Sequence, residues 1–331
     1  TIATVTLTVT QASANPILEL KGNINKNYIE NSGALILANN VKISDSDSSN
    51  FDGGKLTVQI DQNAESTDIL SINNSTKVKT NANQDVYYNG LLVGHYTGGS
   101  GLAALEITFN ANATANVVSE IAERIAYKNS SDNPSIADRS IRYQLSDGDS
   151  GVSDAQYKIV RVFSVNDAPD ISIADNTLTV SRGSITNIGA LSGIQVSDVD
   201  YQAGDRVRIV LKVLVGYLDF TDDLFDLTSI IFKRNPGDGL GSLDFTGTLA
   251  DVNAALERLT YRSRTNYIGI DALTVGVSDM GSSGTYAIPK FDAEGRLIRL
   301  DIGDITLISS YFPSGSSGEE RQSVKMEYLD D

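Results

Sequence analysis

Aspartates separated by one residue occur at several places in this 331-residue sequence, and two such pairs begin equivalent loops after stretches typical of β-strands. Asp45 and Asp47 lie in ISDSDSS, and Asp198 and Asp200 lie in VSDVDYQ. At this spacing two carboxylates lie on the same side of a strand, or they converge in a loop. Like charges held close together are costly unless a cation neutralises them. The pairs therefore predict binding of a hard cation such as Ca²⁺, which takes roughly six to eight oxygen ligands.

A short connection between two predicted strands carries further oxygen donors. Residues 163–172 read FSVNDAPDIS and bring Asn166, Asp167 and Asp170 close together in the chain. A proline turn with an Asx cap explains part of this composition, and that alternative stays open. The interval from Asn166 to Asp198 leaves room for one strand out and one strand back. The second aspartate pair is thus expected at the same end of a domain as the connection.

An internal repeat divides the sequence. Three landmarks occur twice in the same order: ISDSDSSNFDGG (43–54) with VSDVDYQAGD (196–205), IAERIAY (121–127) with ALERLTY (255–261), and QLSDGDSG (144–151) with GVSDMGSSG (276–284). The first copy is longer between its first two landmarks, which predicts an inserted hairpin or loop at about 76–104. The last landmark adds Asp147 and Asp149, although D-G-D-x-G is also an ordinary hairpin turn. One fold used twice is the simplest interpretation.

Apolar residues alternate with polar ones along most of both copies. This period of two predicts half-buried strands, among them 55–60, 105–109, 140–146 and 206–213. One segment per copy instead has helical spacing: 114–125, with Thr114 as N-cap, and 250–259. The fold class predicted is all-β, with tandem antiparallel β-sandwiches that each carry one short helix.

Composition excludes several classes of function. The 42 acidic and 26 basic residues give a net charge of −16, which argues against a nucleic-acid partner. No cysteine is present, so disulfides and thiol chemistry are excluded, and no apolar run is long enough to span a membrane. The single histidine, His95, has no Ser or Asp partner at a catalytic spacing, so we expect no enzyme. The start at Thr1, within a strand-like pattern, indicates a segment of a longer polypeptide.

The order N-D-A-P, D-x-D and S-D-G-D-x-G resembles the cadherin-like repeats of large bacterial surface and secreted proteins, which accompany adhesins and repeat-in-toxin proteins. The first copy is similar over almost its whole length, including YIENSG, YYNGLLVGHYTGG and IAYKNSSDNP. The second matches in SDVD, FTGTLADVNAALERLTYR and NYIGIDALTVGVSD. The resemblance covers about residues 1–285.

This resemblance implies immunoglobulin-like sandwiches with calcium at their junctions, held by a linker, a D-x-D pair and upstream acids. By position, Asn166 and Asp167 match the linker motif, and Glu30 matches an acid on the early strand. The second copy departs from the pattern, because Arg182 stands near the position of Glu30. Asp149 of the first copy likewise aligns with Gly281, or a neighbour of Gly281, in the second copy. The predicted ligands are Glu30, Asp45, Asp47, Asp147, Asp149, Asn166, Asp167, Asp198 and Asp200.

The expected organisation has four parts: 1–14, the end of a preceding repeat; 15–167 and 168–287, two cadherin-like domains; and 288–331, a divergent tail. The function predicted is a non-catalytic calcium-binding segment of an extracellular bacterial protein, in which calcium stiffens the junction of an adhesin. The alternative is a module that binds polysaccharide or another cell-surface protein. Its candidate residues are Tyr87 and Tyr88, although tyrosines before Asn-Gly also commonly flank a hairpin turn.

Overall fold

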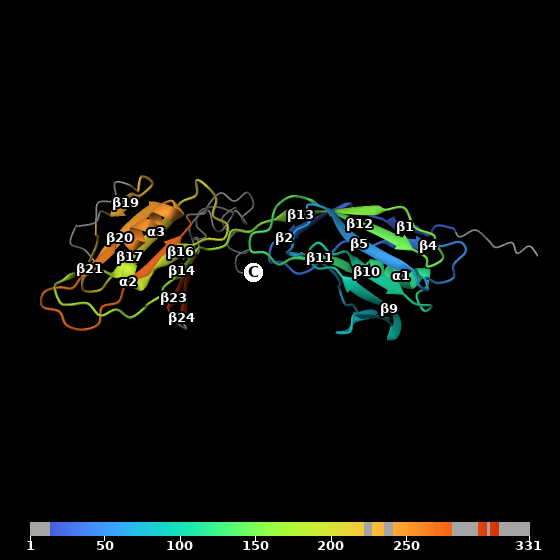
Figure 1. Ribbon diagram of the computed structural model, residues 1–331, viewed down its shortest axis with the longest axis horizontal. Coiled ribbons are helices and arrows are strands. Elements are labelled where there is room, and N and C mark those ends of the chain that lie inside the picture. The colour runs from blue at the N-terminus through green and yellow to red at the C-terminus, as the bar shows by residue number, and fades with distance from the viewer. Residues whose placement is uncertain (1–13, 222–226, 235–240, 280–296, 303–304, 311–331) are drawn as a thin grey trace, which may run out of the picture. The chain divides into compact units, whose positions relative to one another are not determined.

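A computed structural model describes residues 14–221, 227–234, 241–279, 297–302 and 305–310 (Figure 1). The chain divides into two compact units, unit 1 at 1–164 and unit 2 at 165–331. Most of the expected parts 1–14 and 288–331 lies outside the described residues. Within the described ranges, no helix is long and apolar enough to cross a membrane.

Unit 1 is a two-layered β-sandwich with one helix. Its elements are β1 Ile17–Leu20, β2 Asn25–Ile29, β3 Leu35–Ile36, β4 Val41–Ser44, β5 Lys55–Gln62, β6 Asp68–Ile72, β7 Val78–Thr80, β8 Asp85–Tyr88, β9 Leu91–Gly98, β10 Leu105–Phe109, α1 Ala115–Ala122, β11 Ile125–Asn129, β12 Arg139–Ser146 and β13 Gln156–Phe163. One sheet has the order β2-β13-β12-β5-β10-β9-β8-β7. The sheets β3-β11-β6 and β1-β4 complete the sandwich, and all three contribute side chains to one core.

Alternation along the strands builds this core, because successive side chains point to opposite faces of a sheet. In β12, Ile141, Tyr143 and Leu145 are fully buried while the residues between them are only half-buried. Almost all pairing is antiparallel; the exception is β2, which runs parallel to β13 from Asn25 opposite Ile159 to Ile29 opposite Phe163. The last strand of unit 1 is therefore paired on both sides.

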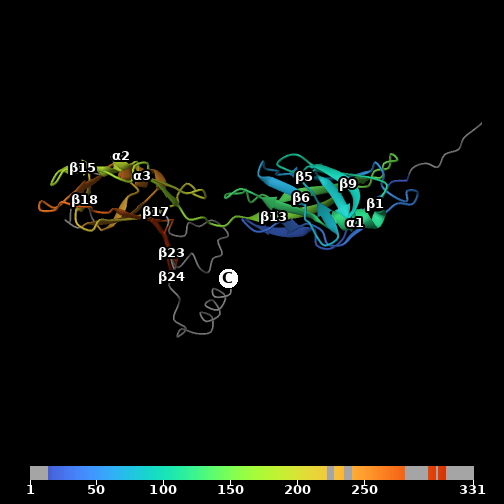
Figure 2. The ribbon, with the colours of Figure 1, turned by 90° about the horizontal axis from the view of Figure 1, so that it is seen from below.

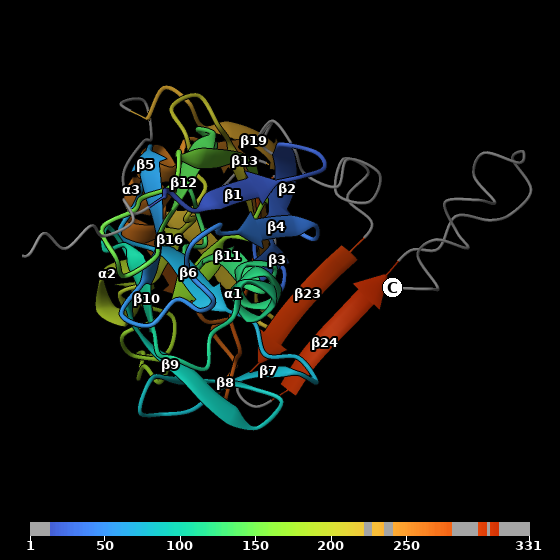
Figure 3. The same ribbon diagram turned by 90° about the vertical axis from the view of Figure 1, so that its right-hand side faces the viewer.

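The expected insertion at 76–104 is a meander that widens the large sheet. Strands β7, β8 and β9 lie at one edge of unit 1 (Figure 3). Asn89 and Gly90, both with positive φ (49° and 83°), form the turn between β8 and β9. Two left-handed residues in succession are typical of a type I′ hairpin turn.

Unit 2 repeats the sandwich with shorter sheets. Its elements are β14 Asp170–Ser172, β15 Ile185–Asn187, α2 Ile188–Ser192, β16 Gln195–Ser197, β17 Val207–Lys212, β18 Tyr217–Phe220, β19 Ile231–Arg234, β20 Ser242–Gly247, α3 Leu249–Glu257, β21 Leu259–Arg262, β22 Thr274–Ser278, β23 Leu297–Ile302 and β24 Ile305–Ser310. The sheets are β19-β20-β17-β22, β15-β21-β18, β14-β16 and β23-β24. Side chains from the first three of these and from both helices form its core.

The predicted all-β class is confirmed, and the four strands named from the sequence are present as β5, β10, β12 and β17. The predicted helices are α1 and α3, but both end earlier than expected. Ile125 and Leu259, expected on the helices, instead begin strands β11 and β21. The expectation of one helix per copy is wrong for unit 2, where the sequence pattern missed the five-residue α2.

A charged network is buried in unit 1. Arg139 and Asp68 have fully buried side chains, and the guanidinium Nε lies 3.3 Å from an Asp68 carboxylate oxygen. The other carboxylate oxygen of Asp68 accepts hydrogen bonds from the Tyr127 hydroxyl (2.6 Å) and the Asn129 amide (2.7 Å). Arg139 also pairs with Glu65 at 2.6 Å and donates to two main-chain carbonyls. These contacts compensate for charges that burial would otherwise make costly.

Helices α2 and α3 of unit 2 pack closely at a glycine (Figure 2). A Cβ placed on Gly189 would lie 1.8 Å from the carbonyl oxygen of Leu256. We expect Gly189→Ala to lower the free energy of unfolding of unit 2 by about 1–3 kcal/mol, because rigid main chain must move. Thermal unfolding measures the effect, with Gly276→Ala as control because its added Cβ meets nothing closer than 3.8 Å. Equal melting temperatures for the two variants would contradict this prediction.

Candidate metal centre

The first aspartate pair lies where the chain enters unit 1. The main-chain N–H of Ala14 donates to Asp47 Oδ2 at 2.8 Å, and this fixes the entering segment to the loop after β4. Asp45 Oδ1 accepts from the N–H groups of Asp47 (3.2 Å) and Ser48 (3.4 Å), as in an Asx turn. The other oxygen, Asp45 Oδ2, is buried and has no hydrogen-bond partner among the described residues.

The loop after β12 brings two more aspartates to this end of unit 1. Asp147 is almost fully buried, and its Oδ1 accepts from the N–H groups of Asp149 (2.7 Å) and Gly151 (3.0 Å). A Cβ on Gly151 would lie 2.1 Å from Asp147 Oδ2 and 2.4 Å from the carbonyl oxygen of Ala14. Only a glycine at position 151 leaves room for both Asp147 Oδ2 and the Ala14 carbonyl oxygen at this point. Asp149 is joined to the D-x-D loop because Ser48 Oγ donates to it at 3.4 Å.

The electrostatics of the first pair differ between its members. Burial, together with the neighbouring Asp47, raises the pKa of Asp45. The hydrogen bond from the Ala14 N–H lowers the pKa of Asp47. The two carboxylates thus differ in their affinity for a proton, although they are only two residues apart.

Unit 2 repeats this arrangement around the second pair. The N–H of Asp167 donates to Asp200 Oδ2 at 2.6 Å, and the N–H of Asp200 donates to Asp198 Oδ1 at 3.0 Å. The Asn166 side-chain amide donates to Asp279, which follows β22. The predicted donors Asn166, Asp167, Asp198 and Asp200 are therefore brought together. Asp170 is not part of the group, because it begins β14 opposite Ser197 and is exposed.

Negative charge is concentrated in this second group. Burial is the largest cause of the raised pKa of Asp198, and the charges of Asp279, Asp200 and Asp205 raise it further. A raised pKa means that the folded protein disfavours the ionised carboxylate. A divalent cation bound there would remove that penalty.

Sequence reasoning missed one residue of this group, Asp279. The same repeat offset that aligns Ser146 with Ser278 also aligns Asp147 with Asp279, so the signal was present in the sequence. Asp149 was compared with Gly281, which lies outside the described residues. The linker position is the same in both copies, 33 residues before the second aspartate of the pair, but the residue whose N–H donates there is Ala14 in unit 1 and Asp167 in unit 2.

Glu30 is not part of the first group. Its N–H donates to the carbonyl of Phe163, so it lies where the chain leaves unit 1. Its side chain is buried, and a carboxylate oxygen lies within 4.8 Å of one from Asp132, which the sequence analysis did not select. The corresponding turn of unit 2 has Arg182 before Gly183, where unit 1 has Glu30 before Asn31 with positive φ. Within unit 1, Glu30 thus lies apart from Asp45, Asp47, Asp147 and Asp149, which gather where the chain enters.

The tyrosines of the meander take structural positions. Tyr88 packs against the core of unit 1, and Tyr87 and Tyr88 lie opposite Leu92 and Leu91 beside the hairpin turn. His95 Nδ1 lies 3.6 Å from an Asp85 oxygen on the neighbouring strand and is about half exposed. The turn interpretation explains both tyrosines, and their role in ligand binding stays a prediction.

The oxygen donors of the two D-x-D groups fit a hard divalent cation. Each group offers several carboxylates at the end of a sandwich, and the first adds a buried carboxylate oxygen of Asp45 and the main-chain carbonyl of Ala14. Carboxylates and carbonyls are the ligands that Ca²⁺ prefers in proteins. Transition metals favour imidazole and thiolate ligands, which neither group contains.

Comparison with known proteins gives no family for this chain. No protein-family model matches the sequence, and no curated protein matches it. Among solved structures, mouse cadherin-23 EC22-24 matches with 10% identity and a TM-score of 0.24, covering 79% of this chain and 66% of that one. The collagen adhesin of S. aureus matches with 10% identity and a TM-score of 0.19, covering 83% of this chain and 89% of that one.

Proposed function

We propose that this chain is a non-catalytic, calcium-binding segment of a large bacterial extracellular protein, in which calcium orders the junctions between sandwiches and stiffens an adhesin. The observation that carries the proposal is the repetition of one arrangement. In each unit the entering main chain donates to the second aspartate of a D-x-D pair. An aspartate after a later strand accepts a hydrogen bond from the same region: Asp149 from Ser48 beside the first pair, and Asp279 from Asn166 of the linker. A plain turn in one copy would not explain the same construction in both.

Calcium at the second group orders the linker between the units. Asp167 follows the end of β13 by four residues in the sequence, and its N–H is held by Asp200. An ion bound to Asp198 and Asp200 fixes this loop and, with it, the segment that leaves unit 1. Within unit 1, Glu30 and Asp132 are neighbouring carboxylates beside the end of β13. Fewer conformations then remain for the connection, and an ion that binds only this ordered form stabilises it.

Calcium titration of the full chain tests the proposal. Isothermal titration calorimetry with CaCl₂ is expected to show saturable binding that Asp198→Asn and Asp200→Asn reduce by at least about tenfold, equivalent to ~1.4 kcal/mol. Asp219→Asn serves as control, because this exposed residue lies on β18, outside both groups. Small-angle scattering is expected to show a narrower distribution of particle dimensions in calcium than in chelator. Absence of binding, or scattering that calcium leaves unchanged, would refute the corresponding part of the proposal.

The partner of such a segment is a surface polymer or another surface protein. The net charge of −16 disfavours contact with nucleic acid and with other polyanions over most of the surface. Any site for an anionic partner must therefore be local.

A further inference from the structure

Two arginines gather over one tyrosine at one end of unit 2 of this acidic protein, and a third precedes a glycine that is hydrogen-bonded to the residue between them. Arg262 is the last residue of β21, the central strand of the sheet β15-β21-β18, and Arg264 follows two residues later. The guanidinium carbons of Arg262 and Arg264 both lie 5.5 Å from the centre of the Tyr217 ring. Arg182 precedes Gly183, whose N–H donates to Ser263 between the two other arginines. We call Arg182, Tyr217, Arg262 and Arg264 the arginine patch.

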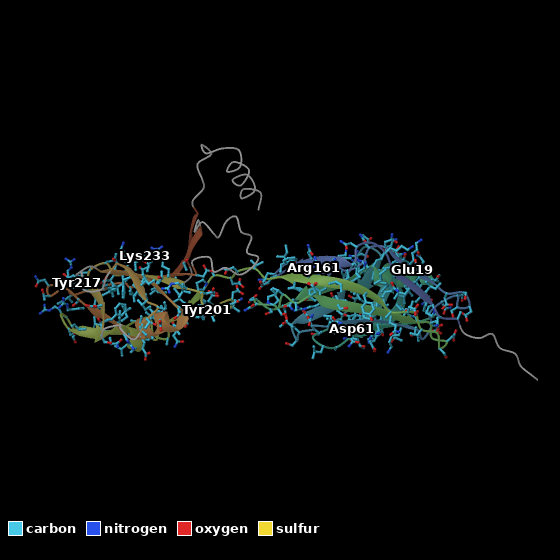
Figure 4. All side chains as sticks on the ribbon, turned by 90° about the horizontal axis from the view of Figure 1, so that it is seen from above. Glu19, Asp61, Arg161, Tyr201, Tyr217 and Lys233 are labelled. Carbon is cyan, nitrogen blue, oxygen red and sulfur yellow. The ribbon has the colours of Figure 1, made fainter. Side chains whose placement is uncertain are left out.

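The arginine patch lies away from the second D-x-D group. Tyr201, which directly follows Asp200, and Tyr217 lie at opposite ends of unit 2 (Figure 4). At a separation beyond a Debye length of about 8–10 Å, the carboxylates of that group are largely screened from a ligand at the patch. The net charge of the chain therefore does not decide what binds here.

This end of unit 2 is the counterpart of the exit of unit 1, but its charge is reversed. Unit 1 has Glu30 in the turn where unit 2 has Arg182. Counting from the matching residues Tyr127 and Tyr261, Ser130 corresponds to Arg264, and Asp132 corresponds to Asn266. Carboxylates that suit a cation are thus replaced by guanidinium and amide groups. The patch suits an anion.

Two carboxylates near the arginine patch, Asp271 and Asp219, belong to the part of the chain that the structure describes. Asp271 accepts hydrogen bonds from the N–H groups of Leu214, Val215 and Gly216 and from the Tyr261 hydroxyl. Burial acts to raise the pKa of Asp271, but these donors lower it below its usual value, so the group is ionised and engaged. Asp219 lies two residues beyond Tyr217, opposite Thr260. Arg262 and Arg264 are both exposed residues.

We propose that the arginine patch binds an anionic polysaccharide, with its carboxylate or sulfate groups on the guanidiniums of Arg262 and Arg264. Arg262 is on a central strand whose register pairs it with Ile185 on one side and Tyr217 on the other. The main chain of β21 is paired on both sides, so a ligand contacts Arg262 through its side chain. Guanidinium groups bind carboxylate and sulfate oxygens with two donors at once. Tyr217 and Ile185, which is 69% exposed, offer apolar contact to the C–H faces of sugar rings.

Binding of the full chain to immobilised polygalacturonate and heparin tests the proposal. The assay contains chelator, so neither bridging calcium nor the D-x-D groups contribute, and its result is independent of the proposed calcium function. We expect binding to polygalacturonate, to heparin or to both. Polygalacturonate offers carboxylates and heparin also offers sulfates, so the preferred polymer indicates which acid group the patch binds. Arg262→Gln and Arg264→Gln are each expected to weaken it about tenfold, as loss of one charged hydrogen-bonding group does.

Matched controls separate this site from general charge effects. Arg161→Gln removes an exposed arginine of unit 1 and is expected to leave binding unchanged. Since Arg264 also donates to the Val215 carbonyl, thermal unfolding establishes that each variant is folded, and Arg264→Lys retains the charge if the glutamine variant does not fold. Equal loss in Arg161→Gln, no loss in the patch variants, or tighter binding to polyglutamate than to either polysaccharide would overturn the proposal. Binding to neutral dextran at equal strength would overturn it as well.

Discussion

The Arg139→Met substitution is expected to lower the free energy of unfolding of unit 1 by about 3–5 kcal/mol. It removes the cation that faces Asp68 and leaves a fully buried carboxylate without its charged partner. The methionine fills similar space, so the loss measures electrostatics more than packing. Scanning calorimetry of the full chain, which follows the transition of unit 1, provides the measurement.

Two companion variants make this result specific. Arg142→Met lies on the same strand and breaks the partly exposed pair with Asp61, so it should cost only about 0.2–1 kcal/mol. Combining Arg139→Met with Asp68→Asn removes the isolated charge and should recover part of the stability. A double variant that is no more stable than Arg139→Met alone would show that the buried charge is not the cause.

Calcium is expected to stabilise unit 2 by about 2.7 kcal/mol when its free concentration is one hundred times the dissociation constant. The gain arises because the ion binds the folded arrangement of Asp198 and Asp200 and has no preformed site in the unfolded chain. Asp198→Asn should remove about half of this gain or more, as a weakening of at least about tenfold implies, whereas Asp219→Asn should retain it. Melting curves in calcium and in chelator measure both, and coincident curves for the unaltered protein would contradict the prediction.

The pH dependence follows from the raised pKa of Asp198. A carboxylate whose pKa is higher in the folded state costs stability at neutral pH, and this cost disappears as pH falls through the raised pKa toward the ordinary value. In chelator, the unfavourable contribution of Asp198 to the free energy of unfolding should therefore shrink as the pH falls. Asp198→Asn should remove this dependence on pH. In calcium the trend reverses, because protons compete with the ion for the same oxygens.

Local patterns were sufficient to predict the strands and the aspartate groups. Alternation of polar and apolar residues identified β5, β10, β12 and β17, because a half-buried strand imposes a period of two. The D-x-D pairs and the linker were recognised because their residues are close in sequence. Asp279 could also be predicted from the repeat, because the offset that aligns Ser146 with Ser278 aligns Asp147 with Asp279.

Features that depend on distant residues could not be predicted in this way. Arg139 occupies a buried position in β12, and its partner Asp68 is 71 residues away. Nothing in the neighbourhood of either residue shows that they meet. Helix α2 was missed because five residues give too little periodicity, and its Gly189 reflects contact with Leu256 rather than local preference. The arginine patch likewise joins β18 and β21, which are paired only in the folded chain.

The parallel pairing of β2 with β13 has a mechanical consequence. In the adhesin proposed above, tension along the backbone would enter unit 1 near Ala14 and leave after Phe163. Such tension pulls β13 toward its C-terminal end and β2 toward its N-terminal end, and the two strands run in the same direction over five register pairs. The hydrogen bonds between them are then loaded in shear and resist together, whereas bonds loaded in a peeling geometry break one after another.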